Sequence, residues 1–172
     1  MISFLKFGLK FGRVYVTLNY QQNEENILGI SIFQHPFTST GINLQKMMRI
    51  GMGLNSIFNL KLNHITNLSN LIQKFETIHK KILNQKENPH WTLLLVCTSE
   101  KSKGIGSDLL FPIFKLADET DIPIFTCLFF SNQEYEKFFK NNGFDLIEKI
   151  KTNQTKNKDE DIDISSLIRK PK

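Results

Sequence analysis

An apolar run at residues 91–97 leads through a glycine turn into an amphipathic segment, and this combination is compatible with few folds. The run, WTLLLVC, is almost continuously apolar, which is typical of a strand covered on both faces of a sheet. Residues 104–119 then repeat apolar side chains with the helical period, namely Ile105, Leu109, Ile113, Leu116 and Ala117. A buried strand joined to such a helix predicts a layered α/β unit.

The same alternation continues to the end of the chain. Residues 122–130 predict a second buried strand, 132–142 a short helix and 144–150 a third strand. A charged loop over 151–161 precedes a last, edge-like strand at 162–169. This order predicts an α/β (α+β) fold with a mixed central β-sheet flanked by helices. Pro112 lies inside the first of these helices and is expected to kink it or to remove one backbone hydrogen bond.

The first half of the chain is less regular. Residues 14–19 and 27–33 are rich in β-branched and aromatic residues, which predicts an antiparallel hairpin joined by a longer polar loop over 21–26. The Met-rich segment 43–60 is weakly helical, and residues 67–84 follow the helical period clearly. With 172 residues and no internal repeat, one domain over 1–172 is expected.

Composition limits the classes of function. The formal charge is +5 and the isoelectric point about 9.2, which would suit an anionic ligand or nucleic acid. The basic residues are scattered, so no nucleic-acid partner is expected, and a basic nucleic-acid-binding domain is only a weaker alternative. Cys97 and Cys127 lie in predicted strands, which indicates buried, reduced thiols. No CxxC or Cys/His spacing indicates a metal site.

The start of the chain does not resemble a targeting segment. Residues 1–12 are apolar, but Lys and Gly interrupt them every few positions, and no cleavage site follows. No run reaches the roughly 18 apolar residues that a membrane-spanning helix needs. The expected location is therefore the cytoplasm, with the nucleus as an alternative.

The turn at residues 101–107, KSKGIGS, is the segment with the clearest chemistry. Glycines there allow backbone N–H groups to approach a ligand, and the N-terminus of a helix favours an anion such as a pyrophosphate. A tight strand–helix connection that binds nothing is the competing interpretation. Leu109 stands where a dinucleotide-binding fingerprint has its third glycine, and no Gly-Lys-Ser/Thr marks a P-loop.

Together with a downstream segment, this turn resembles the GNAT superfamily of N-acetyltransferases. Family members carry a Gln/Arg-x-x-Gly-x-Gly/Ala turn, which residues 101–106 match with Lys101 at the first position. They also carry an Asn…Phe-Tyr-x-x-x-Gly-Phe segment, which Asn132 and residues 138–144 match with Phe139 at the tyrosine position. The resemblance is close over 91–144 and loose elsewhere.

The resemblance implies acetyl-CoA as the acyl donor and a small-molecule or protein amine as the acceptor. The cofactor-binding core would be 91–144, and the acceptor side would lie within 1–84. The pantetheine arm would lie against the strand at 91–97, with the pyrophosphate on the glycine turn. The implied cofactor-binding residues are Leu95, Val96, Cys97, Lys101, Ser102, Lys103, Gly104, Ile105, Gly106, Ser107, Asn132 and Phe139.

The resemblance also implies catalytic residues, and here the sequence departs from the family. His79 and then Glu76 are the candidates for the general base that deprotonates the amine. Family members carry a tyrosine at the position of Phe139, and its hydroxyl is expected to protonate the leaving thiolate. Phe139 has no such hydroxyl, and Tyr135, one helical turn earlier, is the candidate substitute. The N-terminus is shorter than in the family, so either the chain is truncated or the segment 43–60 builds the acceptor-side wall. A non-catalytic acyl-CoA-binding domain is the alternative function.

Overall fold

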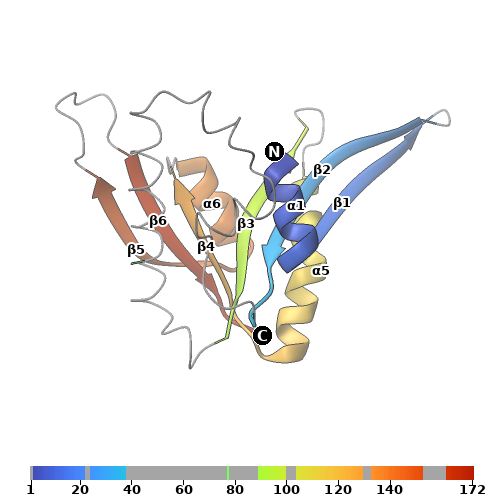
Figure 1. Cartoon of the computed structure of the whole chain (residues 1–172). Helices are drawn as coiled ribbons and strands as arrows, with labels where there is room; N and C mark the ends of the chain where they lie inside the picture. The colour runs from blue at the N-terminus through green and yellow to red at the C-terminus, as the bar shows by residue number, and fades with distance from the viewer. Residues whose placement is uncertain are drawn as a thin grey trace, which may run out of the picture.

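The computed structural model describes residues 2–21, 24–37, 77, 89–99, 104–129, 133–152 and 162–172. They form a six-stranded sheet in the order β1-β2-β3-β4-β6-β5 (Figure 1). The elements are α1 (Ile2–Phe11), β1 (Gly12–Gln21), β2 (Glu24–Gln34), β3 (Trp91–Thr98), α5 (Ile105–Thr120), β4 (Ile124–Phe129), α6 (Gln133–Asn141), β5 (Asp145–Thr152) and β6 (Ile162–Arg169).

The sheet is mixed, as predicted. β3 and β4 are parallel, and each of the other neighbouring pairs is antiparallel. The helix α5 connects the two parallel strands, which is the crossover that such a pair requires. The α+β prediction is therefore confirmed. The prediction of an edge-like last strand is wrong, because β6 lies between β4 and β5 and the edge strand on this side of the sheet is β5. The apolar positions Ile164 and Leu167 of β6 are buried accordingly.

The hairpin is longer than predicted. β1 and β2 pair from Gly12↔Gln34 to Gln21↔Glu24, so only residues 22 and 23 separate the paired positions. The longer loop that was expected over 21–26 is therefore wrong. Polar residues suggested a loop there, but residues 24–26 belong to the end of β2 that pairs with β1 and not with β3, since the pairing with β3 begins at Gly29. A strand that is paired on one side, like an edge strand, tolerates polar side chains that face water.

The helix α1 precedes the hairpin, and the sequence did not predict it. Its glycine, Gly8, packs against the sheet: a Cβ on this residue would lie 2.6 Å from Cγ2 of Ile32 and 2.7 Å from Cγ2 of Val14. Phe7 beside it is buried. Glycine normally disfavours a helix, but here it allows the helix to approach the strands closely. This close approach is a tertiary effect that the local sequence does not reveal.

The helix α5 covers the face of β2 and β3 that is opposite to the face on which α1 packs. Its buried positions are Leu109, Leu110, Ile113 and Ala117. Three of them belong to the predicted apolar stripe, whose other members, Ile105 and Leu116, are only partly buried. Pro112 lies inside it and cannot donate to the carbonyl of residue 108. One turn from the proline, the buried hydroxyl of Ser31 on β2 donates a 2.9 Å hydrogen bond to the carbonyl of Leu109. This bond ties the helix to the sheet beside the proline.

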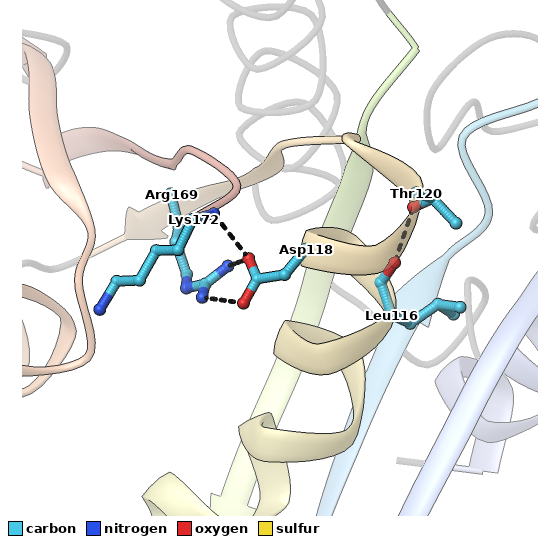
Figure 2. Close-up of polar contacts among 5 residues, drawn as sticks. All are labelled: Leu116, Asp118, Thr120, Arg169 and Lys172. Atoms are coloured by element: carbon cyan, nitrogen blue, oxygen red, sulfur yellow. Dashed lines mark hydrogen bonds and ion pairs between the residues drawn. The ribbon is translucent and has the colours of Figure 1, made fainter.

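A charged clamp joins the end of α5 to the end of β6 (Figure 2). The guanidinium of Arg169 donates hydrogen bonds of 2.8 and 2.9 Å to the two carboxylate oxygens of Asp118. The same guanidinium lies 4.3 Å from the ring centroid of Phe114, and the backbone N–H of Lys172 donates to Asp118. The side chain of Arg169 is only 4% exposed, so a bidentate pair compensates its buried charge.

Two sequence predictions fall on residues that the structure does not describe. The Met-rich segment 43–60 lies wholly outside the described ranges, as does most of the predicted helix 67–84. Thr77, within the latter, is helical and exposed. Across the ranges that the structure does describe, every helix is too short or too polar to cross a membrane.

Candidate functional site

The parallel strands β3 and β4 separate before they end. Their paired positions are Trp91↔Ile124, Thr92↔Phe125 and Leu93↔Thr126, although both strands continue beyond the last pair. β3 stays paired with β2 up to Thr98, and β4 stays paired with β6 up to Phe129. Figure 1 shows the two strands diverging towards their C-terminal ends. We call this region the β3–β4 splay; it comprises residues 94–98 of β3 and 127–129 of β4.

A β-bulge marks the point of separation. On β2, Phe33 pairs with Leu93 and the adjacent Ile32 pairs with Leu95, which leaves Leu94 as the extra residue of β3. A bulge bends its strand and increases the local twist. Since Leu94 directly follows the last residue of β3 that pairs with β4, the bulge explains why the two strands diverge at this position.

The bulge also changes which backbone groups face the splay. The N–H of Trp91 donates to the carbonyl of Pro123, so the backbone of Trp91 faces β4. Beyond the bulge, the N–H of Ser99 donates to the carbonyl of Leu28 on β2. Backbone groups alternate in direction along a strand. The backbones of Leu95 and Cys97 therefore face β2, and those of the intervening residue Val96 and of Thr98 face the splay.

The glycine turn lies at the C-terminal end of β3, and its two glycines differ. Gly104 is the N-cap of α5, with φ of 93° and ψ of −25°, and a Cβ on it would meet no atom within 4 Å in the described part of the chain. It has no side chain with which to cap the first N–H groups of the helix. These groups, including those of Ile105 and Gly106, are thus suited to an anion. The exposed carboxylate of Asp108 in the first turn opposes this preference.

Gly106 has a packing role instead. A Cβ on Gly106 would lie 3.1 Å from two ring carbons of Phe138 on α6 and 3.9 Å from Cγ2 of Thr98 on β3. The second glycine of the turn therefore permits α5, α6 and the end of β3 to meet. This contact brings Thr98 and Phe138 to the site, and the sequence had indicated a role for neither.

The helix α6 presents Phe139 to the core. This side chain is 4% exposed, and its ring meets that of Phe144 edge-on at 5.2 Å and that of Phe138 at the same distance. Tyr135, the predicted substitute for the missing tyrosine hydroxyl, lies one turn earlier and is 55% exposed. The position that carries tyrosine in the GNAT motif is thus filled by a core phenylalanine.

The described structure brings together only part of the predicted site. Leu95 and Val96 are half-buried, Cys97 is exposed, and Gly104, Ile105, Gly106 and Ser107 form the start of α5, where the N–H of Ser107 lies 3.3 Å from the carbonyl of Gly104. The predicted residues that lie outside the described ranges are Glu76, His79, Lys101, Ser102, Lys103 and Asn132.

The two cysteines differ in environment. Cys127 is partly buried beside Ser166, with Sγ 3.4 Å from Oγ, and burial raises the pKa of its thiol to about 12. Cys97 is exposed at the end of β3, so the prediction that both thiols are buried is wrong for this residue. The difference follows from the splay, because beyond Leu93 no described strand covers β3 on the β4 side.

Comparison with known proteins supports the fold. No protein-family model and no curated protein sequence matches the chain. The structure described as histone acetyltransferase HPA2 and related acetyltransferase from Corynebacterium glutamicum aligns with 99% of this chain and 71% of its own, with a TM-score of 0.54 and 17% identity. The structure of arylalkylamine N-acetyltransferase 2 from Aedes aegypti aligns with 96% of this chain and 76% of its own, with a TM-score of 0.63 and 10% identity. The structure of polyamine N-acetyltransferase from Drosophila melanogaster aligns with 95% of this chain and 77% of its own, with a TM-score of 0.56 and 9% identity. This chain therefore has the fold of the GNAT-type N-acetyltransferases.

Proposed function

We propose that the chain is an acetyl-CoA-dependent N-acetyltransferase that transfers the acetyl group to a primary amine. The observation that carries the proposal is the β3–β4 splay, which ends at the N-terminus of α5. The backbone groups of Val96 and Thr98 face the splay, where no strand in the described part of the chain pairs with them, and they offer donors and acceptors to the amide-containing pantetheine arm. The open start of α5 at Gly104 offers N–H groups to the pyrophosphate. Lys101 and Lys103 would add positive charge there.

In the proposed reaction, the amine nitrogen attacks the thioester carbonyl carbon, the carbon–sulfur bond breaks and CoA leaves as the thiolate. The N–H of Val96 faces the splay and is our candidate donor for the negative charge that develops on the carbonyl oxygen. Cys97 is the weaker candidate, since its backbone faces β2. The amine must also lose a proton, and we assign the base to His79, with Glu76 as the second choice.

The acceptor class follows from the fold neighbours only in outline. Two of them are named for arylalkylamine and polyamine acetylation, which favours an amine for this chain too. A small-molecule amine and a protein amine both remain within the proposal. The residues expected to select between them belong to 1–84. Within this range the structure describes residues 2–21, 24–37 and 77.

One observation favours the second candidate, a non-catalytic acyl-CoA-binding domain. Phe139 occupies the tyrosine position of the motif and is packed in the core, so it supplies no proton to the leaving thiolate. A positioned general acid contributes about 10²–10⁴-fold to a rate. A thiol with a pKa of about 8.5 leaves tolerably without one. We therefore place the active enzyme first.

The test combines binding with turnover. Calorimetry should detect saturable binding of acetyl-CoA and CoA but not of NAD, and CoA release should be measured against a panel of arylalkylamines, polyamines and peptides. Lys103→Glu should weaken binding, whereas Lys6→Glu on α1 should not. Binding without turnover on any amine would favour the non-catalytic domain. A folded protein that binds no acetyl-CoA would contradict both candidates.

A further inference from the structure

One side chain contacts both strands at the point where the splay begins. The hydroxyl of Thr126 on β4 donates a 3.1 Å hydrogen bond to the carbonyl of Leu93 on β3. Leu93 and Thr126 are also the last paired positions of the two strands. Thr126 is 3% exposed, so this bond is made out of contact with water. A buried hydroxyl therefore links β4 to β3 at the vertex of the splay, the point where the two strands separate.

Neighbouring residues explain why this bond matters beyond the vertex. Leu94 follows the bonded carbonyl and is the bulged residue, and Val96, two positions further, directs its backbone into the splay. The outer sides of both strands are held by β2 and β6. The inner sides are joined at the vertex by the three parallel pairs and by the Thr126 hydroxyl. The hydrogen bond of Thr126 thus links β3 to β4 at the residue directly before the bulge.

We propose that Thr126 is a positioning residue for the acyl-CoA. Its hydroxyl fixes the carbonyl of Leu93 at the vertex and so sets the orientation of the Val96 backbone towards the pantetheine arm. This inference rests on the proposed function. It goes beyond it by assigning a role to a residue of β4 that belongs to neither the glycine turn nor the α6 motif. A purely structural role would alter stability without altering which part of the ligand is recognised.

The substitutions Thr126→Val and Thr126→Ser separate these roles. Valine keeps the branched shape and removes the hydroxyl, and serine keeps the hydroxyl and removes the methyl group. The matched control is Thr92→Val, since Thr92 is also buried, lies on β3 one position before Leu93 and pairs with Phe125. The probes are acetyl-CoA and 3′-phospho-ADP, the nucleotide half of CoA, which lacks the pantetheine arm.

We expect Thr126→Val to weaken acetyl-CoA binding about three- to tenfold, the range of one hydrogen bond, and to leave binding of 3′-phospho-ADP unchanged. Thr126→Ser and Thr92→Val should bind both probes like the wild type. Equal weakening of both probes by Thr126→Val, or no weakening of either, would overturn the inference. A serine variant that behaves like the valine variant would also overturn it. If Thr126→Val does not fold, Thr126→Ser decides the matter: weakened acetyl-CoA binding by this variant, which keeps the hydroxyl, would overturn the inference. Wild-type protein that binds no acetyl-CoA would instead overturn the proposed function, and this inference with it.

Discussion

The carboxylate of Asp118 and the guanidinium of Arg169 face each other in a bidentate ion pair that joins the C-terminal end of α5 to the last residue of β6. The residues are 51 positions apart in the sequence. α5 begins at the proposed pyrophosphate site, and β6 pairs with the β4 side of the splay. The pair therefore holds together two elements that border the candidate site.

This ion pair predicts a specific sensitivity to acid. The hydrogen bond from Arg169 holds the pKa of Asp118 below its ordinary value of 3.8, although burial opposes this shift. A carboxyl whose pKa is lower in the folded state stabilises the fold above its unfolded pKa and loses that contribution as the pH falls through the folded pKa. Asp118→Asn should therefore lower the free energy of unfolding by about 1–3 kcal/mol at neutral pH, and the difference from wild type should shrink below about pH 4.

The control for this experiment lies on the same helix. Glu119 forms an exposed i,i+4 pair with Lys115, with 3.9 Å between Oε1 and Nζ. Glu119→Gln should change stability by less than about 0.5 kcal/mol at either pH. Denaturant melts of both variants at neutral and acidic pH make the comparison. An Asp118→Asn difference that persists unchanged in acid would contradict the account.

The two glycines of the turn should respond differently to a change on α6. Gly106→Ala brings a methyl group against Phe138, and Phe138→Leu provides room for it. We expect a coupling free energy of about 0.5–3 kcal/mol between these two substitutions in a double-mutant cycle. Gly104→Ala should cost about 1–2 kcal/mol because of its positive φ, with no coupling to Phe138→Leu. Equal coupling at both glycines would be inconsistent with the packing seen at Gly106.

The two thiols should react at very different rates. Burial raises the pKa of Cys127 to about 12, which leaves almost no thiolate at pH 8, whereas Cys97 is exposed. Iodoacetamide should therefore modify one cysteine in the native protein and both after denaturation. Peptide mapping of the native product should place the label on Cys97, and Cys97→Ser should abolish native labelling. Fast native labelling of Cys127 would show that the buried environment is wrong.

The missing tyrosine hydroxyl predicts a gain of function. If the chain transfers acetyl groups, Phe139→Tyr should raise kcat by about tenfold or more with the best amine of the panel, since it restores the group that protonates the leaving thiolate. Tyr135→Phe tests the candidate substitute and should lower kcat if Tyr135 is that acid. Phe139→Leu is the control for altered core packing. A tyrosine variant with wild-type kcat and a lowered melting temperature would assign position 139 to the core alone.

The sequence predicted the elements that have strong local patterns and missed those that depend on tertiary contacts. The helix over 104–119 and the strand over 91–97 were found within a residue of their observed bounds, because a buried stripe and an apolar run are local signals. The helix α1 was missed because Gly8 disfavours a helix unless a sheet lies against it. The edge position of β5 depends on strand order, which no local pattern specifies.

The surroundings of the predicted site likewise depend on tertiary structure. Glycines and the α6 motif indicated where a nucleotide-like ligand would bind, but no residue in the run WTLLLVC marks Leu94 as the bulge. The assignment of Val96 rather than Cys97 to the splay follows from that bulge and was therefore beyond the sequence. Thr126 had one available signal: it is a polar residue within the otherwise apolar run of β4.

Amide hydrogen exchange resolved at single residues, with and without acetyl-CoA, would show whether the pantetheine arm binds in the β3–β4 splay. In the free protein, the N–H of Cys97 should be protected by its pairing with β2, and those of Val96 and Thr98 should exchange faster. Saturating acetyl-CoA should slow exchange at Val96 and Thr98 and change Cys97 little. Unchanged exchange at Val96 and Thr98 in protein shown by calorimetry to be saturated would contradict a pantetheine arm bound in the β3–β4 splay.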